Sequence, residues 1–199
     1  MRKTRIFLAM ALAFALAAPP LSAQSTLERL ARDLNRALGP GHAQLSGRQA
    51  PSPVRTRKTG EAPVLHSAVV DQLVEAMNRE RAAYGLRPLH LNQQLTLAAG
   101  DRINDMFAKH YFSHVSPDGI DPFTWADRRG YDYRLIGENL AVGYPTVSGV
   151  VDGWMHSPGH RANILKRGFD EIGVAVAGGS PTRSYSGPTI VALYGARNS

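Results

Sequence analysis

Three titratable side chains stand out as candidates for chemistry, and they are His114, Glu138 and His160. Each lies in a turn-rich stretch beside large apolar residues, where a carboxylate must be paired, hydrogen-bonded or neutral. His160 follows Pro158-Gly159 at a predicted helical turn, where the helix dipole disfavours the imidazolium and favours a neutral ring. Two imidazoles and a carboxylate can bind a metal ion, transfer protons or hydrogen-bond a ligand, and they can also simply tie loops to the core.

Two histidine pairs also have the i, i+4 spacing with which one helix can chelate a metal ion. His110 and His114 form the first pair, and His156 and His160 form the second. The first pair lies at the end of a predicted helix, and Pro158-Gly159 breaks the helix of the second. The chain contains no His-Glu-x-x-His motif, so neither pair is predicted to be a closed metal site.

Hydrolytic and calcium-binding arrangements are less well supported by the spacing. Ser157, His160 and Glu138 could form a hydrolytic triad, but the chain lacks the Gly-x-Ser-x-Gly turn that exposes such a serine. Asp118 and Asp121 do not have the ligand spacing of an EF-hand loop. We therefore interpret these two aspartates as part of a solvated loop.

The composition narrows the class of protein. The chain has no cysteine, which excludes a disulfide framework and thiol catalysis. Its net charge is +7, and removal of Arg2, Lys3 and Arg5 with a leader would lower it to +4. So modest a charge does not indicate nucleic-acid binding.

The N-terminal residues have the pattern of a secretory signal peptide over residues 1–23. A basic start precedes the apolar run Ile6 to Ala18, and small residues precede Gln24. Cleavage after Ala23 would leave no run apolar and long enough to span a membrane. The predicted location is therefore secreted or periplasmic, with a retained N-terminal anchor as the alternative.

Three further segments follow the leader. Residues 24–38 have a capping box and a leucine face, which predict a short amphipathic helix. Residues 39–63 are rich in Gly, Pro, Ser and Arg and are interpreted as a flexible linker. Residues 64–199 are predicted to form one domain.

Within that domain, apolar spacing predicts helices over about 70–84, 93–110 and 146–155, with another helix from Pro122 to near Gly130 and a turn over 160–165. Asn92 is a predicted N-cap. Strands are predicted over 133–141, 172–176 and 189–194. Helices that precede a terminal hairpin indicate an α+β fold with an antiparallel sheet.

Five short segments carry a resemblance to a known family. They are Asn78 to Arg81 with Gly85 to Leu89, Tyr111 to Gly119, Gly137 to Ala141, Trp154 to Leu165, and Glu171 to Val174. Together and in this order they resemble the bacterial branch of the CAP superfamily, also called SCP-like domains. That superfamily comprises cysteine-rich secretory proteins, antigen 5 and pathogenesis-related proteins. The resemblance spans about residues 64–197.

The resemblance implies an α-β-α sandwich with a small antiparallel sheet between helical layers. It also implies a cleft in which His114, Glu138 and His160 converge, and which binds a divalent metal in some relatives. The fourth member of the family's usual cleft is a Glu shortly after the Trp, whereas here Met155, His156 and Ser157 follow Trp154. Ser157 or His156 stands near its place, so a metal on His114 and His160 would have fewer protein ligands.

The leading interpretation is a secreted domain that acts by binding, and the resemblance implies no turnover. We expect the cleft to bind a small ligand, a divalent ion, a lipid or an envelope component, with no cofactor required and zinc, calcium or magnesium as the optional cation. The alternative is a metal-assisted hydrolase of peptide or envelope polymer, with Glu138 as the base to a bound water. A purely structural role for the three residues is the third possibility. No nucleic-acid partner and no stable membrane span are expected.

Overall fold

The computed structural model describes residues 4–6 and 68–198. The predicted amphipathic helix 24–38 and the linker 39–63 lie outside these residues. So does the predicted signal peptide, apart from residues 4–6. The assignments of these three segments therefore remain predictions.

The two longest helices form where apolar residues recur at helical spacing. Helix α2 (Ala68–Ala83) buries residues of one stripe, and helix α3 (Gln93–Ala108) does the same on the other side of the molecule. The predicted N-cap of α3 is confirmed, because the Asn92 side chain accepts a hydrogen bond from the backbone N–H of Leu95. Thr146 caps helix α5 (Val147–His156) in the same way through the N–H of Gly149.

Helix α4 (Thr124–Arg128) is shorter than the sequence predicts. Pro122 was expected at its first position but lies before the N-cap residue, Phe123. The carboxylate of Asp121 accepts the N–H groups of Phe123 and Thr124 at 2.8 and 3.0 Å. An acidic side chain ahead of the proline therefore satisfies the free donors of this helix.

Helix α6 (Pro158–Ile164) begins two residues earlier than predicted. The break between α5 and α6 falls at Ser157, whose backbone is extended with φ −97° and ψ 117°. Pro158 then occupies the first turn, where the missing N–H costs nothing. His160 consequently lies within the first turn of α6.

The sheet has five strands in the order β1-β3-β5-β4-β2. The three long strands β3 (Tyr133–Val142), β5 (Thr189–Arg197) and β4 (Glu171–Ala177) pair antiparallel, as predicted. Two short strands, β1 (Thr4–Ile6) and β2 (His90–Leu91), pair parallel with β3 and β4 at the edges. Strand β1 comes from the segment predicted to be a signal peptide.

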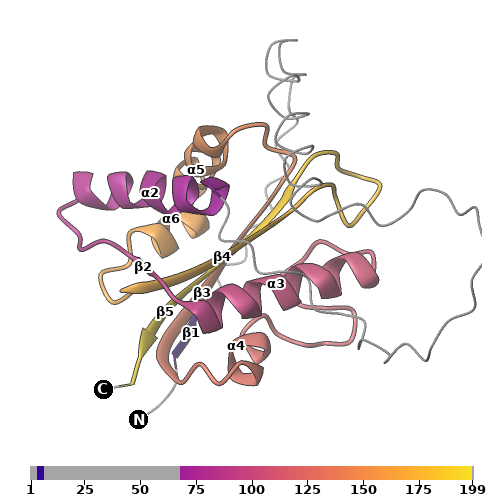
Figure 1. The fold of residues 1–199 in the computed structure, drawn as a ribbon, viewed down its shortest axis with the longest axis horizontal. Coiled ribbons are helices and arrows are strands. Elements are labelled where there is room, and N and C mark those ends of the chain that lie inside the picture. The colour runs from indigo at the N-terminus through magenta and orange to yellow at the C-terminus, as the bar shows by residue number, and fades with distance from the viewer. Residues whose placement is uncertain (1–3, 7–67, 199) are drawn as a thin grey trace, which may run out of the picture.

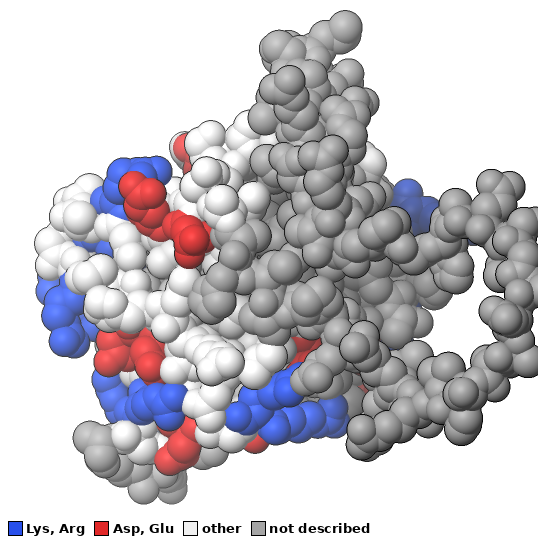
Figure 2. Space-filling model, in the orientation of Figure 1, with Lys and Arg blue, Asp and Glu red and all other residues white. Residues whose placement is uncertain are grey.

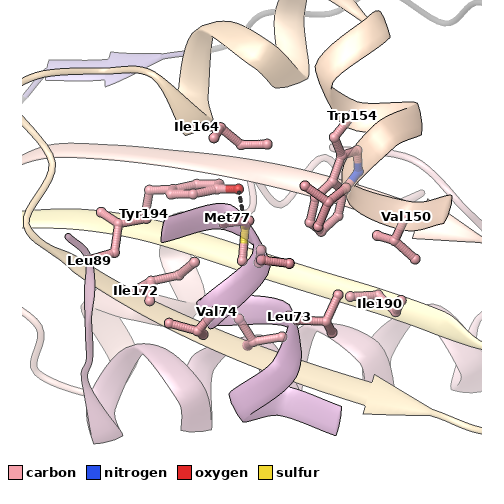
Figure 3. Close-up of a cluster of buried hydrophobic side chains, with 14 of the residues drawn as sticks. Leu73, Val74, Met77, Leu89, Val150, Trp154, Ile164, Ile172, Ile190 and Tyr194 are labelled. Atoms are coloured by element: carbon pink, nitrogen blue, oxygen red, sulfur yellow. Dashed lines mark hydrogen bonds between the residues drawn. The ribbon is translucent and has the colours of Figure 1, made fainter. Parts of the chain in front are cut away.

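Helices cover both faces of the sheet. Figure 1 shows α2, α5 and α6 on one side and α3 and α4 on the other. Each side has its own buried apolar core, and Figure 3 shows part of the core beneath α2, where Leu73, Met77, Trp154 and Tyr194 are labelled. Successive residues of β3 therefore face different cores, because side chains alternate along a strand.

Charged side chains of both signs are interspersed over the described part of the surface seen in Figure 2. A search of the described helices finds none that is long and apolar enough to cross a membrane.

Candidate ligand-binding site

Glu138 lies in the middle of β3, paired with Leu193 of β5. Its side chain is 1% exposed. It lies between Ile136 and Leu140, which belong to the core beneath α3. A buried carboxylate needs partners for both oxygens, and the structure provides them from two different elements.

Arg102 of α3 is the first partner of Glu138, and the sequence analysis missed it. Its Nε donates to Oε2 of Glu138 at 3.2 Å, and both side chains are almost fully buried. Arg102 falls on the apolar stripe of α3 together with Leu95, Ala98, Ala99, Ile103 and Met106. An arginine at such a position must be paired, and this was the available signal.

His114 is the second partner of Glu138. Its Nδ1 lies 2.7 Å from Oε1 of Glu138, and its side chain is 28% exposed. Arg102 also donates to the backbone carbonyls of Ser113 and His114, the latter at 2.8 Å. The loop that carries the imidazole is thus held at both its backbone and its ring, and Nε2 is the ring nitrogen that Glu138 leaves free.

His160 is placed by α6 and by the strand residue next to Glu138. Asn139 donates from Nδ2 to the backbone carbonyl of His160 at 3.1 Å. The His160 ring packs near Trp154, with centroids 6.4 Å apart and an interplanar angle of 48°. Glu138 and Asn139 point to opposite faces of β3, so one strand positions the elements that carry both histidines.

The pKa of His160 is lowered from 6.5 to about 4, first by burial and second by the charge that His114 can carry. His160 is therefore neutral at neutral pH. The second cause is an electrostatic interaction with His114. Within the described part of the chain, no hydrogen bond is formed by a ring nitrogen of His160.

A buried amide network connects β3 to α6 behind the histidines. Asn163 donates to the backbone carbonyl of Glu138 at 3.0 Å and to the side-chain oxygen of Asn139 at 2.9 Å. Asn139 also donates to the hydroxyl of Tyr194 at 3.1 Å, and that hydroxyl contacts the sulfur of Met77 (Figure 3). These contacts fix the spacing between the strand and the helix that present Glu138 and His160.

The other candidates lie apart from this arrangement or take a lesser part. The α3 helix ends at Ala108 and His110 has a left-handed backbone with φ 55°, so His110 and His114 do not share a helix. His156 is exposed, and its Nδ1 lies 2.8 Å from the backbone carbonyl of Asp152. Ser157 is half-buried before α6, and its side chain makes no capping hydrogen bond.

The donor set for a metal ion is limited to the two imidazoles. Among residues 68–198, no three His, Asp or Glu side chains are gathered so that they could hold an ion. Glu138 has both oxygens engaged by Arg102 and His114. If His114 were to bind a metal ion, Glu138 would lie behind it as a hydrogen-bond partner, an arrangement that orients metal-binding imidazoles in proteins.

Comparison with known proteins places the chain in a family. The model of the cysteine-rich secretory protein family (CAP) matches residues 74–194. The chain is 39% identical over 153 residues to the uncharacterized protein YkwD of Bacillus subtilis, covering 76% of this chain and 56% of YkwD. It is 31% identical over 105 residues to the uncharacterized membrane protein YlbC of the same organism, covering 53% of this chain and 30% of YlbC. The chain thus spans about half or less of the length of these curated relatives.

Two solved structures are similar in fold. An extracellular protein from Bacillus anthracis that contains an SCP domain superposes with a TM-score of 0.56 at 26% identity, over 65% of this chain and 40% of that one. An outer surface protein from Borrelia burgdorferi superposes with a TM-score of 0.57 at 22% identity, over 65% and 93%, and supports the fold alone. The chain, although it has no cysteine, belongs to the cysteine-rich secretory protein (CAP) family and has the α+β sandwich of that family.

Proposed function

We propose that this CAP domain is a binding module that takes up its ligand through the imidazoles of His114 and His160. The observation that carries the proposal is the pairing of two histidines in different chemical settings. His114 is oriented by a buried carboxylate at 2.7 Å, and His160 is half-buried with a pKa of about 4. Two such rings offer nitrogen atoms to a ligand without the repulsion that two imidazolium groups would exert.

A divalent cation, held with water or with a polar group of a larger ligand, is the simplest occupant. Imidazole nitrogen suits zinc, whereas calcium and magnesium prefer oxygen ligands. Because residues 68–198 add no third His, Asp or Glu to the two imidazoles, an ion bound there would keep open positions. Such an ion would act there as a Lewis acid toward an oxygen of the ligand. Zinc is therefore the first probe to use.

We place the action of the protein outside the cytoplasm, with an envelope component or a lipid as the wider ligand class. The N-terminal pattern of residues 1–23 supports this, and a fold neighbour is described as extracellular. Mass spectrometry of the exported protein tests the location. The expected mature N-terminus is Gln24, and an exported chain that retains residue 1 would contradict cleavage.

Metal-assisted hydrolysis with Glu138 as the base is less well supported. A general base needs a free oxygen within reach of the water that it activates. Both oxygens of Glu138 are already engaged, Oε2 by Arg102 and Oε1 by Nδ1 of His114. The contacts of Glu138 match orientation of His114 better than proton abstraction.

Thermal unfolding with added cations tests the binding proposal. A ligand at about 100 times its Kd stabilises a folded protein by about 2.7 kcal/mol. We expect zinc to raise Tm, calcium and magnesium to raise it less, and EDTA to reverse the shift. An unchanged Tm with zinc at millimolar concentration would contradict cation binding and leave an organic ligand as the remaining form of the proposal.

A further inference from the structure

We propose that Arg102 is a positioning residue that fixes which ring nitrogen of His114 faces the ligand. The inference rests on the proposed function, in which His114 contacts the ligand. Arg102 is fully buried and does not contact the ring of His114, yet it would determine which nitrogen of that ring carries the proton. The inference is based on the relative positions of three groups: the guanidinium of Arg102, the carboxylate of Glu138 and the imidazole of His114.

Every nitrogen of the Arg102 guanidinium is used. Its Nε donates to Glu138, one terminal nitrogen donates to the Tyr111 hydroxyl, and the other donates to the carbonyls of Ser113 and His114. The residue is 0% exposed. One rigid group therefore sets the position of the carboxylate relative to the loop that carries the imidazole.

The pairing with Arg102 determines the chemistry of the Glu138–His114 hydrogen bond. A carboxylate that faces a guanidinium accepts hydrogen bonds and donates none. The Nδ1 of His114, 2.7 Å away, must then carry the proton. In the neutral ring this leaves the lone pair on Nε2, which is the atom available to a cation or to a donor group of the ligand.

Loss of Arg102 would remove this constraint. Without the guanidinium, Oε2 of Glu138 has lost its donor, and the carboxyl group is no longer required to be the acceptor in its contact with Nδ1 of His114. The proton of the neutral imidazole would then move to Nε2. The lone pair would point at Glu138, and the nitrogen facing the ligand could no longer bind a cation.

Arg102 is itself held in place from the side opposite Glu138. The Tyr111 hydroxyl that accepts from Arg102 donates to Asp105 at 2.5 Å, and Lys109 lies 2.6 Å from the same carboxylate. Burial, and then the hydrogen bond to Asp105, raise the pKa of Tyr111 to about 12, so its hydroxyl remains protonated at neutral pH. Lys109 also contacts Asp118 in the exposed loop at 2.5 Å, which connects the network to the surface.

Arg81 provides a matched control. It is also 0% exposed, but its guanidinium donates to backbone carbonyls, those of Arg87, Ile164, Lys166 and Phe169. These contacts tie α2 to the chain that follows it, to the last residue of α6 and to the chain after α6. Substitution of Arg81 therefore tests loss of a buried arginine without disturbance of Glu138.

The experiment is nitrogen NMR of the histidine rings in the full chain at neutral pH, without added ligand. The shifts of the two ring nitrogens report which of them is protonated. We expect wild-type His114 to be in the Nδ1–H form. That form should decline in the order wild type, Arg102→Lys, Arg102→Met, because lysine can pair with Glu138 but cannot also hold both loop carbonyls. Arg81→Lys should leave the ring of His114 unchanged.

Each outcome decides the proposal. An Nε2–H form in wild type overturns it, as does an unchanged His114 in Arg102→Met. If Arg102→Met does not fold, the comparison of Arg102→Lys with Arg81→Lys decides, and identical His114 spectra in the two overturn it.

Zinc titration separates this inference from the proposed function. Loss of a partner behind a metal ligand typically weakens metal binding 10- to 100-fold, and we expect a loss of about that size in Arg102→Met and little change in Arg81→Lys. If wild type binds no zinc, cation binding fails while the NMR result still decides the role of Arg102. If zinc binds equally to wild type and Arg102→Met, the proposed function stands and the inference is wrong.

Discussion

His160 is the residue whose setting has the most direct consequence for stability. Its folded pKa of about 4 lies below the ordinary value of 6.5, because burial and the nearby His114 disfavour its charged form. Between these two values the unfolded chain binds a proton that the folded chain does not. The stability associated with neutral His160 is therefore fully present above about pH 6.5 and is lost as the pH falls toward 4.

We predict that His160→Gln flattens the fall in stability over this pH range. The shift corresponds to roughly 1–2 kcal/mol once solvent screening of a half-buried ring is allowed for. Urea unfolding at a series of pH values measures it. His156→Gln, at an exposed histidine, serves as the control and should keep the wild-type slope. Identical slopes in both variants and wild type would contradict the assigned pKa.

Some residues of the candidate site could be named from the sequence, and others could not. His114, Glu138 and His160 were found because they stand in segments that resemble a family. Arg102 could not be named from apolar periodicity, because that pattern identifies the apolar residues of a helix face and not a polar residue among them. Its partner was not identifiable either, since the contact joins residues 36 positions apart.

The end of α3 contains a residue in a costly conformation. His110 has φ 55° immediately beyond the helix, and the N–H of Tyr111 returns to the carbonyl of Met106 at 3.1 Å. Glycine is the usual residue at this position because it lacks a Cβ. The left-handed conformation costs other residues about 1–2 kcal/mol.

We predict that His110→Gly raises the free energy of unfolding by about 0.5–1 kcal/mol, because part of that cost is offset by the greater entropy of unfolded glycine. Urea denaturation measures the change. The same substitution at the exposed His156, the last residue of α5, should lower stability, by at most the cost of about 1 kcal/mol for glycine in a helix interior. A loss of stability in His110→Gly would contradict the description of this helix end.

The contact of α3 with β4 depends on a missing side chain. A Cβ on Gly173 would lie 2.1 Å from the backbone carbon of Leu95 and 2.2 Å from the backbone nitrogen of Thr96. Neither backbone atom can move without displacing α3, which carries Arg102. The sequence of residues 171–174 predicts a strand. It does not explain why residue 173 is glycine, because the close approach of α3 to β4 is known only from the folded structure.

We predict that Gly173→Ala lowers the free energy of unfolding by about 3 kcal/mol or more, the upper range for overpacking. Gly178→Ala is the control, because a Cβ there meets nothing within 4 Å, and it should change stability by less than about 0.5 kcal/mol. Thermal and urea unfolding of the two variants test this. Equal stabilities would contradict the close packing of α3 on β4.

Elements with strong periodicity or a side-chain cap, such as α3 and α5, were predictable from sequence. The starts of α4 and α6 were not, because they depend on Asp121 acting across a proline and on the extended backbone of Ser157. The parallel pairing of β1 and β2 at the sheet edges was not predicted, since two or three residues carry no detectable alternation.

Over the whole molecule, the sheet links two helical layers to one site. Glu138 faces the layer that contains α3, and Asn139 faces the layer that contains α6. The two histidines therefore come from opposite layers and depend on the same strand. A site built in this way requires the folded sandwich, which is why local motifs could name its residues but not their contacts.

The measurement that tests this account most directly is calorimetric titration of zinc into three forms of the full chain. These are wild type, the double variant His114→Ala with His160→Ala, and a control in which the exposed His110 and His156 are both replaced by Ala. Both double variants lose two imidazoles, but only the first loses the proposed site. Circular dichroism first establishes that each variant is folded.

We predict that wild type and the control bind zinc with one site of similar affinity, and that the His114/His160 variant loses that site while remaining folded. Equal zinc binding by a folded His114/His160 variant and by wild type would contradict the assignment of this pair as the binding site.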